Sequence, residues 1–330
     1  MRTRFCVLAL LAACAASAAD TSFGLLPPDS GMIMGFNIAR IRATPFARDL
    51  SAELERQAGS LGVPAGPAAL SLFNGIDGVT IAIAQVSDNR GLVVIRGSFS
   101  RGVYDQWVRP QEVSTALVRG IRVTTLRSTQ NSRMKNPAIA LVDSGLILGG
   151  DAASVGEAIA RRARSGASAP ALARKAGELS ASHDLWLVAR VPADGLAGQA
   201  AASPQLQRAL AIGRSVEQVS LGLNVGATLD LAAELVARTP EDADAMVNGL
   251  RLLMTMAASG RDQQSKSLAP LLQQVDLRPE GKLIRLNVSL TQEQLKQLRL
   301  GGAARPAVNP NEITIQSSPK DMGTVKIIRH

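Results

Sequence analysis

Cysteine and histidine are almost absent from this sequence, and their scarcity excludes several kinds of chemistry. The 330 residues include two cysteines, Cys6 and Cys14, and two histidines, His183 and His330. Both cysteines stand near the N-terminus, which excludes a disulfide framework, a thiolate nucleophile and a cysteine-ligated metal in the rest of the chain. Zinc sites need nitrogen or sulfur ligands, and the two histidines show no paired spacing. We therefore expect no metal site and no cofactor.

Motifs of known catalytic chemistry are missing as well. A Ser-His-Asp triad has to use His183, because His330 ends the chain, and no G-x-S-x-G string accompanies it. Residues 132–135 read S-x-x-K and residues 87–89 read S-D-N, but this order is the reverse of that in penicillin-binding enzymes and no K-T-G follows. Residues 145–156 contain glycines but neither a P-loop nor a G-x-G-x-x-G string. The sequence thus indicates no catalytic residue.

Aromatic residues are scarce, and long hydrophobic runs are missing. Aromatics make up 3% of the chain, and beyond residue 163 only Trp186 is aromatic, so the cores must be built from Leu, Val, Ile and Ala. Hydrophobic residues nevertheless make up 46% and charged residues 19%, which is the composition of a globular protein. After the N-terminal segment no apolar run approaches the roughly 18 residues that span a bilayer. We expect no transmembrane helix in the mature chain.

The N-terminus, residues 1–19, has the pattern of an export signal. Two arginines precede an apolar run at residues 5–11, and small residues follow. Two processing outcomes remain open. Cleavage after the A-x-A string at residues 16–18 releases a free protein, whereas residues 11–14 resemble a bacterial lipobox, which implies a lipidated Cys14. We predict an exported protein that is periplasmic or attached to the cell envelope.

A unit of two strands, a tight turn and a capped helix occurs twice, at residues 138–162 and 275–298. In each copy a glycine separates two apolar runs, and a Ser/Thr-x-x-Glu/Gln capping box follows. The turn glycines are Gly145 and Gly281, for which we predict positive φ. The capping boxes are Ser154 with Glu157 and Thr291 with Gln294. This recurrence predicts an internal duplication.

The duplication gives a plan for the whole chain, whose length fits two domains. A first α+β repeat covers residues 20–163, a linker with a helix covers 164–182, a second repeat covers 183–300, and a tail covers 301–330. Expected strands lie at residues 31–41, 76–86, 92–99, 121–127, 184–191, 216–225 and 229–237. Expected helices lie at residues 45–58 after an N-cap at Thr44, in a short segment after Ser100, and at residues 240–259 after Thr239.

Long apolar strands joined by short turns indicate how these elements pack. They predict mostly antiparallel sheets with the helices on one face. The fold class is therefore α+β, with two related units. Because ligands bind preferentially at domain interfaces, we expect the binding site in the groove between the two units.

Positive charge is in excess, with a net charge of +9. Basic residues outnumber acids most strongly between residues 101 and 135. Such a stretch attracts lipid headgroups, acidic polysaccharide or nucleic acid, although it is also typical of an ordinary solvated surface. For an exported protein nucleic acid is the least suitable of these partners. The candidate binding residues are Arg119, Arg122, Arg127, Tyr104 and Trp107.

The sequence favours a non-enzymatic role in binding or scaffolding for an exported bacterial cell-envelope protein. We expect its partner to be another envelope protein or an anionic envelope component. Two alternatives stay open. One is a peripheral binder of anionic surfaces that uses the Arg-rich stretch. The other is a hydrolase of envelope polymers, because dispersed acids such as Asp88, Asp105 and Glu112 can meet in space without leaving a motif.

Overall fold

The computed structural model describes residues 21–44, 67–84, 90–127, 136–164, 170–192, 215–259, 276–291, 293–294, 312–315 and 325–328. Several predictions therefore lie outside the described residues. These are the export signal with Cys14, the helix at residues 45–58, Asp88, and all of the tail except its two short strands.

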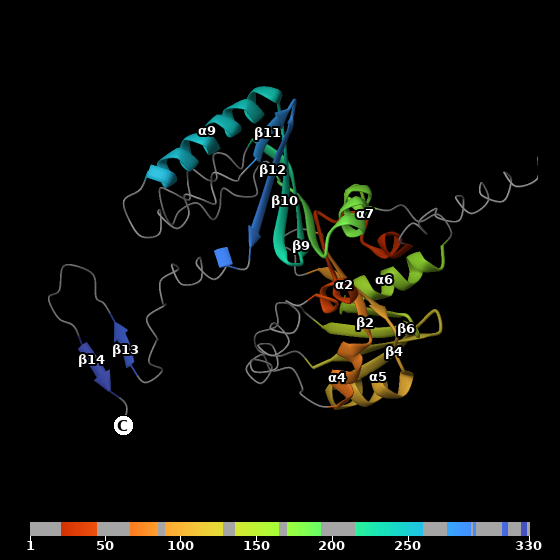
Figure 1. Ribbon diagram of the computed structural model, residues 1–330. Helices are drawn as coiled ribbons and strands as arrows, with labels where there is room; N and C mark the ends of the chain where they lie inside the picture. Colours follow the sequence, from red (N-terminus) through yellow and green to blue (C-terminus); the bar gives the residue numbers. More distant parts are fainter. Residues whose placement is uncertain are drawn as a thin grey trace, which may run out of the picture.

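One antiparallel sheet of 12 strands dominates the structure (Figure 1). Its strands are β1 (Met32–Asn37), β2 (Ile76–Ile83), β3 (Gly91–Gly97), β4 (Glu112–Val118), β5 (Ile121–Leu126), β6 (Pro137–Asp143), β7 (Leu146–Asp151), β8 (Leu185–Arg190), β9 (Val216–Val225), β10 (Thr228–Ala237), β11 (Asp276–Glu280) and β12 (Leu283–Thr291). They lie in the order β11-β12-β10-β9-β8-β1-β2-β3-β7-β6-β5-β4. In the tail, β13 (Glu312–Ile315) pairs with β14 (Val325–Ile328). The predicted combination of helices with a large antiparallel sheet is confirmed.

Few helices accompany this sheet. Within the described residues the α-helices are α2 (Ile38–Arg42), α4 (Pro67–Asn74), α5 (Arg101–Val108), α6 (Ala152–Arg162), α7 (Ala173–Ser182) and α9 (Pro240–Ser259). Short 3-10 turns are η2 (Thr21–Leu25) and η3 (Arg109–Gln111). Helix α9 has the predicted bounds, and the Thr239 hydroxyl caps it by accepting a hydrogen bond from the Asp242 N–H at 3.1 Å.

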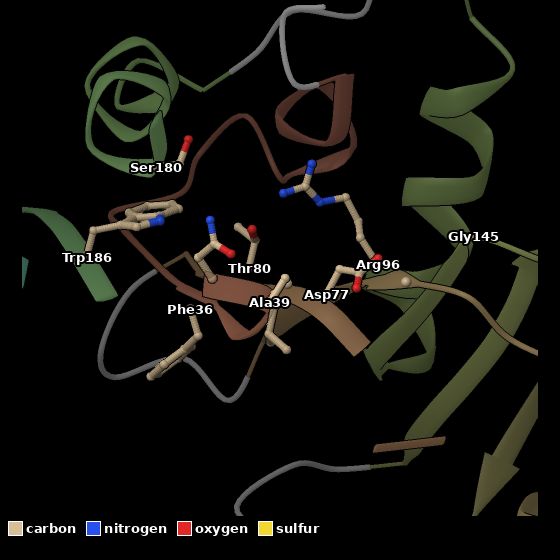
Figure 2. A pocket seen from close by; sticks show the side chains of 12 residues that line it. Phe36, Ala39, Asp77, Thr80, Arg96, Gly145, Ser180 and Trp186 are labelled. Carbon is tan, nitrogen blue, oxygen red and sulfur yellow. The ribbon is translucent and has the colours of Figure 1, made fainter. Parts of the chain in front are cut away.

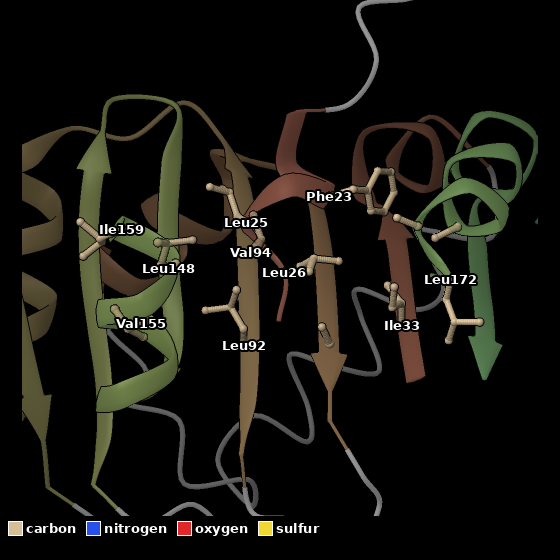
Figure 3. Close-up of a cluster of buried hydrophobic side chains, with 14 of the residues drawn as sticks. Phe23, Leu25, Leu26, Ile33, Leu92, Val94, Leu148, Val155, Ile159 and Leu172 are labelled. Atoms are coloured by element: carbon tan, nitrogen blue, oxygen red, sulfur yellow. The ribbon is translucent and has the colours of Figure 1, made fainter. Parts of the chain in front are cut away.

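Residues of strand β6 alternate between two cores on opposite faces of the sheet. Ala138 and Ala140 belong to the largest core, which η2, α6 and α7 cover (Figure 3). Ile139 and Leu141 belong to a second core that includes Tyr104 of α5. Because successive side chains of a strand point to opposite faces, helices cover both faces of this part of the sheet. The prediction that helices lie on one face is not confirmed.

The largest core is built mainly from aliphatic side chains, as the scarcity of aromatics requires. Figure 3 shows Val155 and Ile159 of α6 packed toward Leu148 of β7. The aromatic exceptions are Phe23 and Trp186, whose ring centroids are 6.0 Å apart. A third core lies between α9 and strands β9–β12, and contains buried residues Met246, Val247 and Ile284 among others.

The second copy of the strand–turn–strand–helix unit has the predicted local chemistry. Gly281 sits at φ +61°, in the left-handed region that glycine tolerates best. Thr291 and Gln294 form a reciprocal capping box. The Thr291 N–H donates to Gln294 Oε1 at 2.8 Å, and the Gln294 N–H donates to Thr291 Oγ1 at 3.3 Å.

In the first copy, both local predictions are wrong. Gly145 does not have positive φ. Its N–H instead donates to Asp143 Oδ1 at 2.7 Å, so an aspartate side chain shapes the turn. The helix starts three residues earlier than the Ser154–Glu157 box implies. Its N-cap is Asp151, whose carboxylate accepts from the Ser154 N–H at 2.9 Å.

Burial alone would raise the pKa of the Asp151 carboxyl. Hydrogen bonds from the Ser154 hydroxyl and from the Ser154 and Gly91 N–H groups outweigh that effect, and its pKa lies below the ordinary value. Asp151 therefore caps the N-terminus of α6 and also links this helix to β3.

The opening strand is shorter than predicted. β1 ends at Asn37, not at Ile41, because the Asn37 side chain starts a new helix by accepting a hydrogen bond from the Arg40 N–H at 3.1 Å. Apolar residues continue into α2, which is why the sequence pattern gave no sign of the change from strand to helix.

Candidate functional site

A pocket of about 360 Å³ lies beside the junction of strands β1 and β8 (Figure 2). Strand β1 belongs to the first half of the chain and β8 to the second, and the two pair in the middle of the sheet. The pocket is lined by Phe36, Asn37, Ala39, Asp77, Gly78, Val79, Thr80, Arg96, Gly97, Gly145, Ser180 and Trp186. Ten of the lining residues belong to the first expected repeat, Ser180 belongs to the expected linker and Trp186 to the second repeat, so the pocket lies mostly on the first repeat and not in a groove between the two units.

The floor of the pocket is a row of residues from three neighbouring strands. Asn37 of β1 pairs with Gly78 of β2, and Gly78 pairs in turn with Arg96 of β3. Gly78 leaves open the space above the middle strand. A Cβ atom there would lie 3.5 Å from Arg96 Nη2, so the guanidinium reaches back over β2. Cross-strand pairing alone brings these polar side chains together.

Irregular backbone shapes one end of this floor. The pairing of β2 with β3 shifts between Ile76 and Gly78, so Asp77 is the extra residue of a bulge. Gly97 is also required here, because a Cβ on it would lie 1.9 Å from the carbonyl oxygen of Gly75. The bulge brings Asp77, which is exposed, to the same end of the pocket as Arg96 (Figure 2).

Opposite these charged groups, Trp186 and Ser180 form the other wall (Figure 2). Trp186 is buried at 6% exposure. The Ser180 hydroxyl donates to the Gly177 carbonyl at 2.9 Å, which fixes its orientation on α7. The pocket thus has an aromatic surface on one side and a cation with a carboxylate on the other.

Arg40 ties the two halves together next to the pocket. Its Nε lies 3.1 Å from Asp184 Oδ1, and its Nη1 and Nη2 atoms donate to the carbonyls of Ala181 and Ser182 at the end of α7. The buried Asp184 carboxylate also accepts a hydrogen bond from the Val225 N–H of β9 at 2.9 Å. A cation at a helix C-terminus is favourable, so this arrangement holds α2, α7 and β9 in fixed relation.

The chemistry of the pocket suits recognition better than catalysis. Asp77 is the one acid among its lining residues, and neither histidine nor cysteine lines it. General acid–base chemistry of the glycosidase type uses two carboxyl groups on either side of the substrate. Arginine and aspartate facing an indole ring instead provide an anion-binding group, a cation-binding group and a stacking surface.

A second, smaller depression of about 180 Å³ lies on the same strands and has an apolar lining. Met34, Leu187 and Leu221 meet there because they are direct cross-strand neighbours on β1, β8 and β9. Leu221 is 37% exposed. The junction of the halves therefore carries both depressions.

The predicted aromatic binding residues, Tyr104 and Trp107, pack against a core and do not form an exposed binding tip. Tyr104 is 4% exposed and belongs to the core under α5. Burial raises the pKa of its hydroxyl, and Arg122 and Arg101 lie close enough to act on it electrostatically. Trp107 is half-buried and packs against the same core. Both aromatics fix α5 to the sheet.

The predicted arginines lie on the hairpin β4–β5. Arg119 (φ +50°) and Gly120 (φ +79°) form its turn, Arg122 lies on β5, and Arg127 follows the end of β5. All three are exposed, and within the described part of the chain none has an ion-pair partner. Arg119 and Arg122 share one end of the hairpin, whereas Arg127 lies at the other, so the three do not form one cluster.

The remaining sequence candidates are dispersed. Asp105 is half-buried on α5, and Glu112 is exposed at the start of β4, where it accepts a hydrogen bond from the Thr115 hydroxyl at 2.7 Å. The His183 ring lies over Gly222. Among the described residues no group of histidine, cysteine and acidic side chains is arranged to hold a metal ion.

No motif in the sequence singles out the pocket residues. Asn37, Thr80 and Arg96 are far apart along the chain and meet only through strand pairing. One signal was nevertheless present. Glycines inside strands, here Gly78 and Gly97, mark places where another group approaches the backbone closely.

Comparison with known proteins yields a relationship in fold only. No family model matches the chain, and no curated protein matches it. Among solved structures, crystal form I of TP0453 is similar, with a TM-score of 0.51 and 10% identity over 86% of this chain and 97% of that chain. Crystal form III of TP0453 gives a TM-score of 0.51 and 8% identity over 85% and 98%. The likeness is one of fold.

Proposed function

We propose that this chain is an exported, non-enzymatic binding protein of the bacterial cell envelope that holds a small polar ligand in the pocket at the β1–β8 junction. The observation that carries the proposal is the set of groups converging there. A guanidinium, a carboxylate, an amide, hydroxyls and an indole ring meet in one pocket of about 360 Å³. A few placed polar groups beside an aromatic surface are typical of small-molecule sites.

The charged groups suggest the class of ligand. Arg96 offers a planar donor set that suits a carboxylate or phosphate, and Asp77 at the same end suits an ammonium or hydroxyl group. Trp186 offers a flat apolar surface for the rest of the molecule. We infer a ligand that bears an anionic group together with a hydrogen-bond donor, such as an amino acid or a sugar acid.

Export is supported by the sequence of residues 1–19, with its charged start, apolar run and small-residue end. Within the described residues no helix is long and apolar enough to cross a membrane. Attachment to the envelope would then depend on lipidation of Cys14 or on binding to an envelope component.

The strand order supports an internal duplication, which we include in the proposal. β1 and β8 are neighbours at the middle of the sheet. Moving outward from them, the first half places β2, β3, β7 and β6, and the second half places β9, β10, β12 and β11. In both halves the strands thus occupy corresponding positions outward from the centre of the sheet. The first half has one additional hairpin, β4–β5.

A second candidate function is attachment to an anionic surface. It is favoured by Arg119 and Arg122, which lie exposed and without ion-pair partners among the described residues at one end of the hairpin β4–β5. Exposed cations at a protruding turn can approach lipid phosphates or acidic polysaccharide with little desolvation. The two candidate functions use different parts of the molecule and are compatible.

The pocket proposal is tested with Trp186 as the reporter. The chain has two tryptophans, so Trp107→Phe leaves Trp186 as the sole indole. This variant is titrated with free amino acids, glucuronate and inorganic phosphate. We expect a saturable change in fluorescence with at least one of these probes, loss of the change in Arg96→Gln, and partial retention in Arg96→Lys.

Arg90→Gln is the matched control, because Arg90 is an exposed arginine paired with Asp29 and does not line the pocket. It should bind as the parent variant does. If no probe gives a saturable change, or if Arg96→Gln binds as tightly as the parent, the pocket does not have the proposed role.

A further inference from the structure

Asn37 belongs both to the pocket and to the start of a helix. It ends β1 and lines the pocket, and its side-chain Oδ1 atom accepts a hydrogen bond from the Arg40 N–H at 3.1 Å at the start of α2. Because the oxygen and the NH2 group of an amide point in different directions, this bond fixes which way the amide is turned. Within the described part of the chain no group accepts a hydrogen bond from Asn37 Nδ2. Asn37 therefore offers donor hydrogens to a ligand.

Gly78 lies between Asn37 and Arg96 and leaves a space between their side chains. The three residues are direct neighbours on β1, β2 and β3, so their positions share one face of the sheet. Two strand spacings of about 4.8 Å separate the backbones of Asn37 and Arg96 by about 10 Å. A Cβ on Gly78 would lie 3.5 Å from Arg96 Nη2, so the guanidinium extends over the middle strand toward this space. An amide and a guanidinium thus border the same space above Gly78.

We propose that Asn37 and Arg96 together bind a carboxylate group of the ligand above Gly78, and that Asn37 is the residue that selects it. Both assignments rest on the function proposed above and add to it the position of the anion. Carboxylate oxygens only accept hydrogen bonds, so they suit donors on both sides of the space. A carboxamide would turn its own NH2 group toward one of these donors and leave polar groups unpaired, so the pocket should discriminate against it.

Other polar groups of the pocket offer acceptors. The Ser180 hydroxyl donates its hydrogen to the Gly177 carbonyl at 2.9 Å, so its oxygen can accept a hydrogen bond from a ligand. Asp77 offers a carboxylate, and because Asp77 is exposed, solvent and salt screen its repulsion of a bound anion. A ligand that carries hydroxyl or ammonium groups besides its carboxylate satisfies both sets.

Asn37→Asp tests the donor without removing the helix cap. Aspartate caps a helix as well as asparagine does, so the bond from the Arg40 N–H should remain. The second oxygen of the introduced carboxylate then takes the place of the NH2 group, where it repels an anionic ligand and competes for Arg96.

The parent for this test is the Trp107→Phe variant, and the probes are glucuronate and alanine with their neutral amides, glucuronamide and alaninamide. The parent should bind each acid more tightly than its amide. Asn37→Asp should bind both acids at least about 10-fold more weakly, as loss of a hydrogen bond to a charged group predicts, and should lose the preference for the acids. Trp186 fluorescence and the rise in the thermal unfolding midpoint on adding each probe measure this binding independently.

Asn74→Asp is the matched control for the added charge. It makes the same change at an exposed residue of α4 that does not line the pocket, and it should bind as the parent does. Without a probe, the unfolding midpoints of both aspartate variants should be close to that of the parent, which separates an effect on binding from an effect on folding.

Gly78→Ala tests the position of the anion. The backbone of Gly78 lies outside the left-handed region, and a Cβ would be in ordinary contact with Arg96 Nη2 and the Phe36 carbonyl oxygen, each at 3.5 Å. The fold should therefore tolerate the methyl group, which occupies the space assigned to the carboxylate. Both acids should bind at least about 10-fold more weakly, because the displaced carboxylate loses a charged hydrogen bond. Gly149→Ala adds a methyl group in equally ordinary contact inside β7, outside the pocket lining, and should bind as the parent does.

Failure of the whole pocket and failure of the carboxylate assignment give different results. If the parent binds neither these acids nor phosphate, both are wrong. If the parent binds an acid and Arg96→Gln abolishes that binding while Asn37→Asp retains it, the pocket keeps its role and the assignment to Asn37 is wrong. Undiminished binding in Gly78→Ala, binding of phosphate but of neither acid, or a parent that binds each amide as tightly as its acid would equally overturn the carboxylate site above Gly78.

Discussion

The indole ring of Trp186 occupies the space in which Gly35 would carry a side chain. The two residues are direct partners on β8 and β1, the strands that join the halves of the chain. A Cβ atom on Gly35 would lie 2.3 Å from Trp186 Cζ2, and the ring is buried. The next strand repeats this arrangement, since the His183 ring lies over Gly222, itself the partner of Trp186. Glycines in these strands therefore make room for rings.

Gly35→Ala should destabilise the protein through this contact. The new methyl group cannot be accommodated unless the buried indole moves, and overpacking of a core costs about 1–3 kcal/mol. Urea unfolding followed by Trp186 fluorescence measures the loss in the free energy of unfolding, and a shifted emission maximum in the native state would report the displaced ring.

Gly156→Ala is the matched control for this substitution. Gly156 lies inside α6 and a Cβ there would meet nothing within 4 Å. Alanine should stabilise the helix by about 0.5–1 kcal/mol. If Gly35→Ala is as stable as the parent, the ring does not lie where the structure places it.

The two turn glycines should respond differently to substitution. Gly281→Val should cost at least about 1 kcal/mol, because valine strongly disfavours the φ of +61°. Gly281→Asn should cost less, since asparagine tolerates this region. Gly145→Ala should be mild, because its φ is not positive and a Cβ would be 3.4 Å from Asp143 Oδ1. Thermal unfolding of the three variants checks this order, and equal effects at both glycines would contradict it.

His183 should make stability depend on pH in the mildly acidic range. Burial lowers the pKa of its imidazole below the ordinary 6.5, the Asn224 side chain and Asp184 act to raise it, and Arg40 and Lys175 lower it further. The unfolded chain then binds a proton more readily than the folded one. This contribution to stability is complete above about pH 6.5 and is lost as the pH falls toward the folded pKa.

His183→Gln should remove that part of the pH dependence. Urea unfolding of parent and variant at pH 7.5, 6.5 and 5.5 compares the two slopes. A parent stability that rises on acidification through this range, or an equal slope in the variant, would show that the imidazole is not held neutral by its surroundings.

The surface-attachment hypothesis predicts a salt-sensitive interaction. Arg119/Arg122/Arg127→Ala should weaken binding to vesicles rich in anionic lipid by about 30-fold, at about 1 kcal/mol for each of the two arginines at the turn, Arg119 and Arg122. Binding by the parent should fall steeply with added salt. Arg164/Arg174/Arg190→Ala removes the same charge from exposed positions elsewhere and should have much less effect. Cosedimentation measures both, and equal losses would indicate a general charge effect.

Sequence patterns were reliable where a single segment decides its own structure. Helix α9 follows from its Thr239 cap and its apolar periodicity, and the Thr291–Gln294 box formed as its spacing predicted. Sequence patterns failed where two local signals competed for the same helix start. At the start of α6 both Asp151 and Ser154 are good N-caps, and Asp151 was chosen because its carboxylate also binds the Gly91 N–H of β3.

The sequence did not predict the composition of the candidate site. We expected a ligand in a groove between the two halves, whereas the pocket lies next to the strand pair that joins them and is lined mostly by the first half. Its polar residues come from β1, β2, β3 and α7, and their proximity depends on a strand register that leaves no trace in the spacing of the residues. The predicted Tyr104 was misplaced for a related reason, because periodicity shows that a helix has an apolar face but not how deeply that face is buried.

The sequence by itself determined that this protein has aliphatic cores and antiparallel strands, because composition, period-2 alternation and turn chemistry act locally. Only the tertiary structure decided that the halves share one sheet through β1 and β8, that a polar pocket lies beside this junction, and that β4 is the last strand of the sheet. Those outcomes depend on which strands become neighbours, and that is set by the packing of the whole chain.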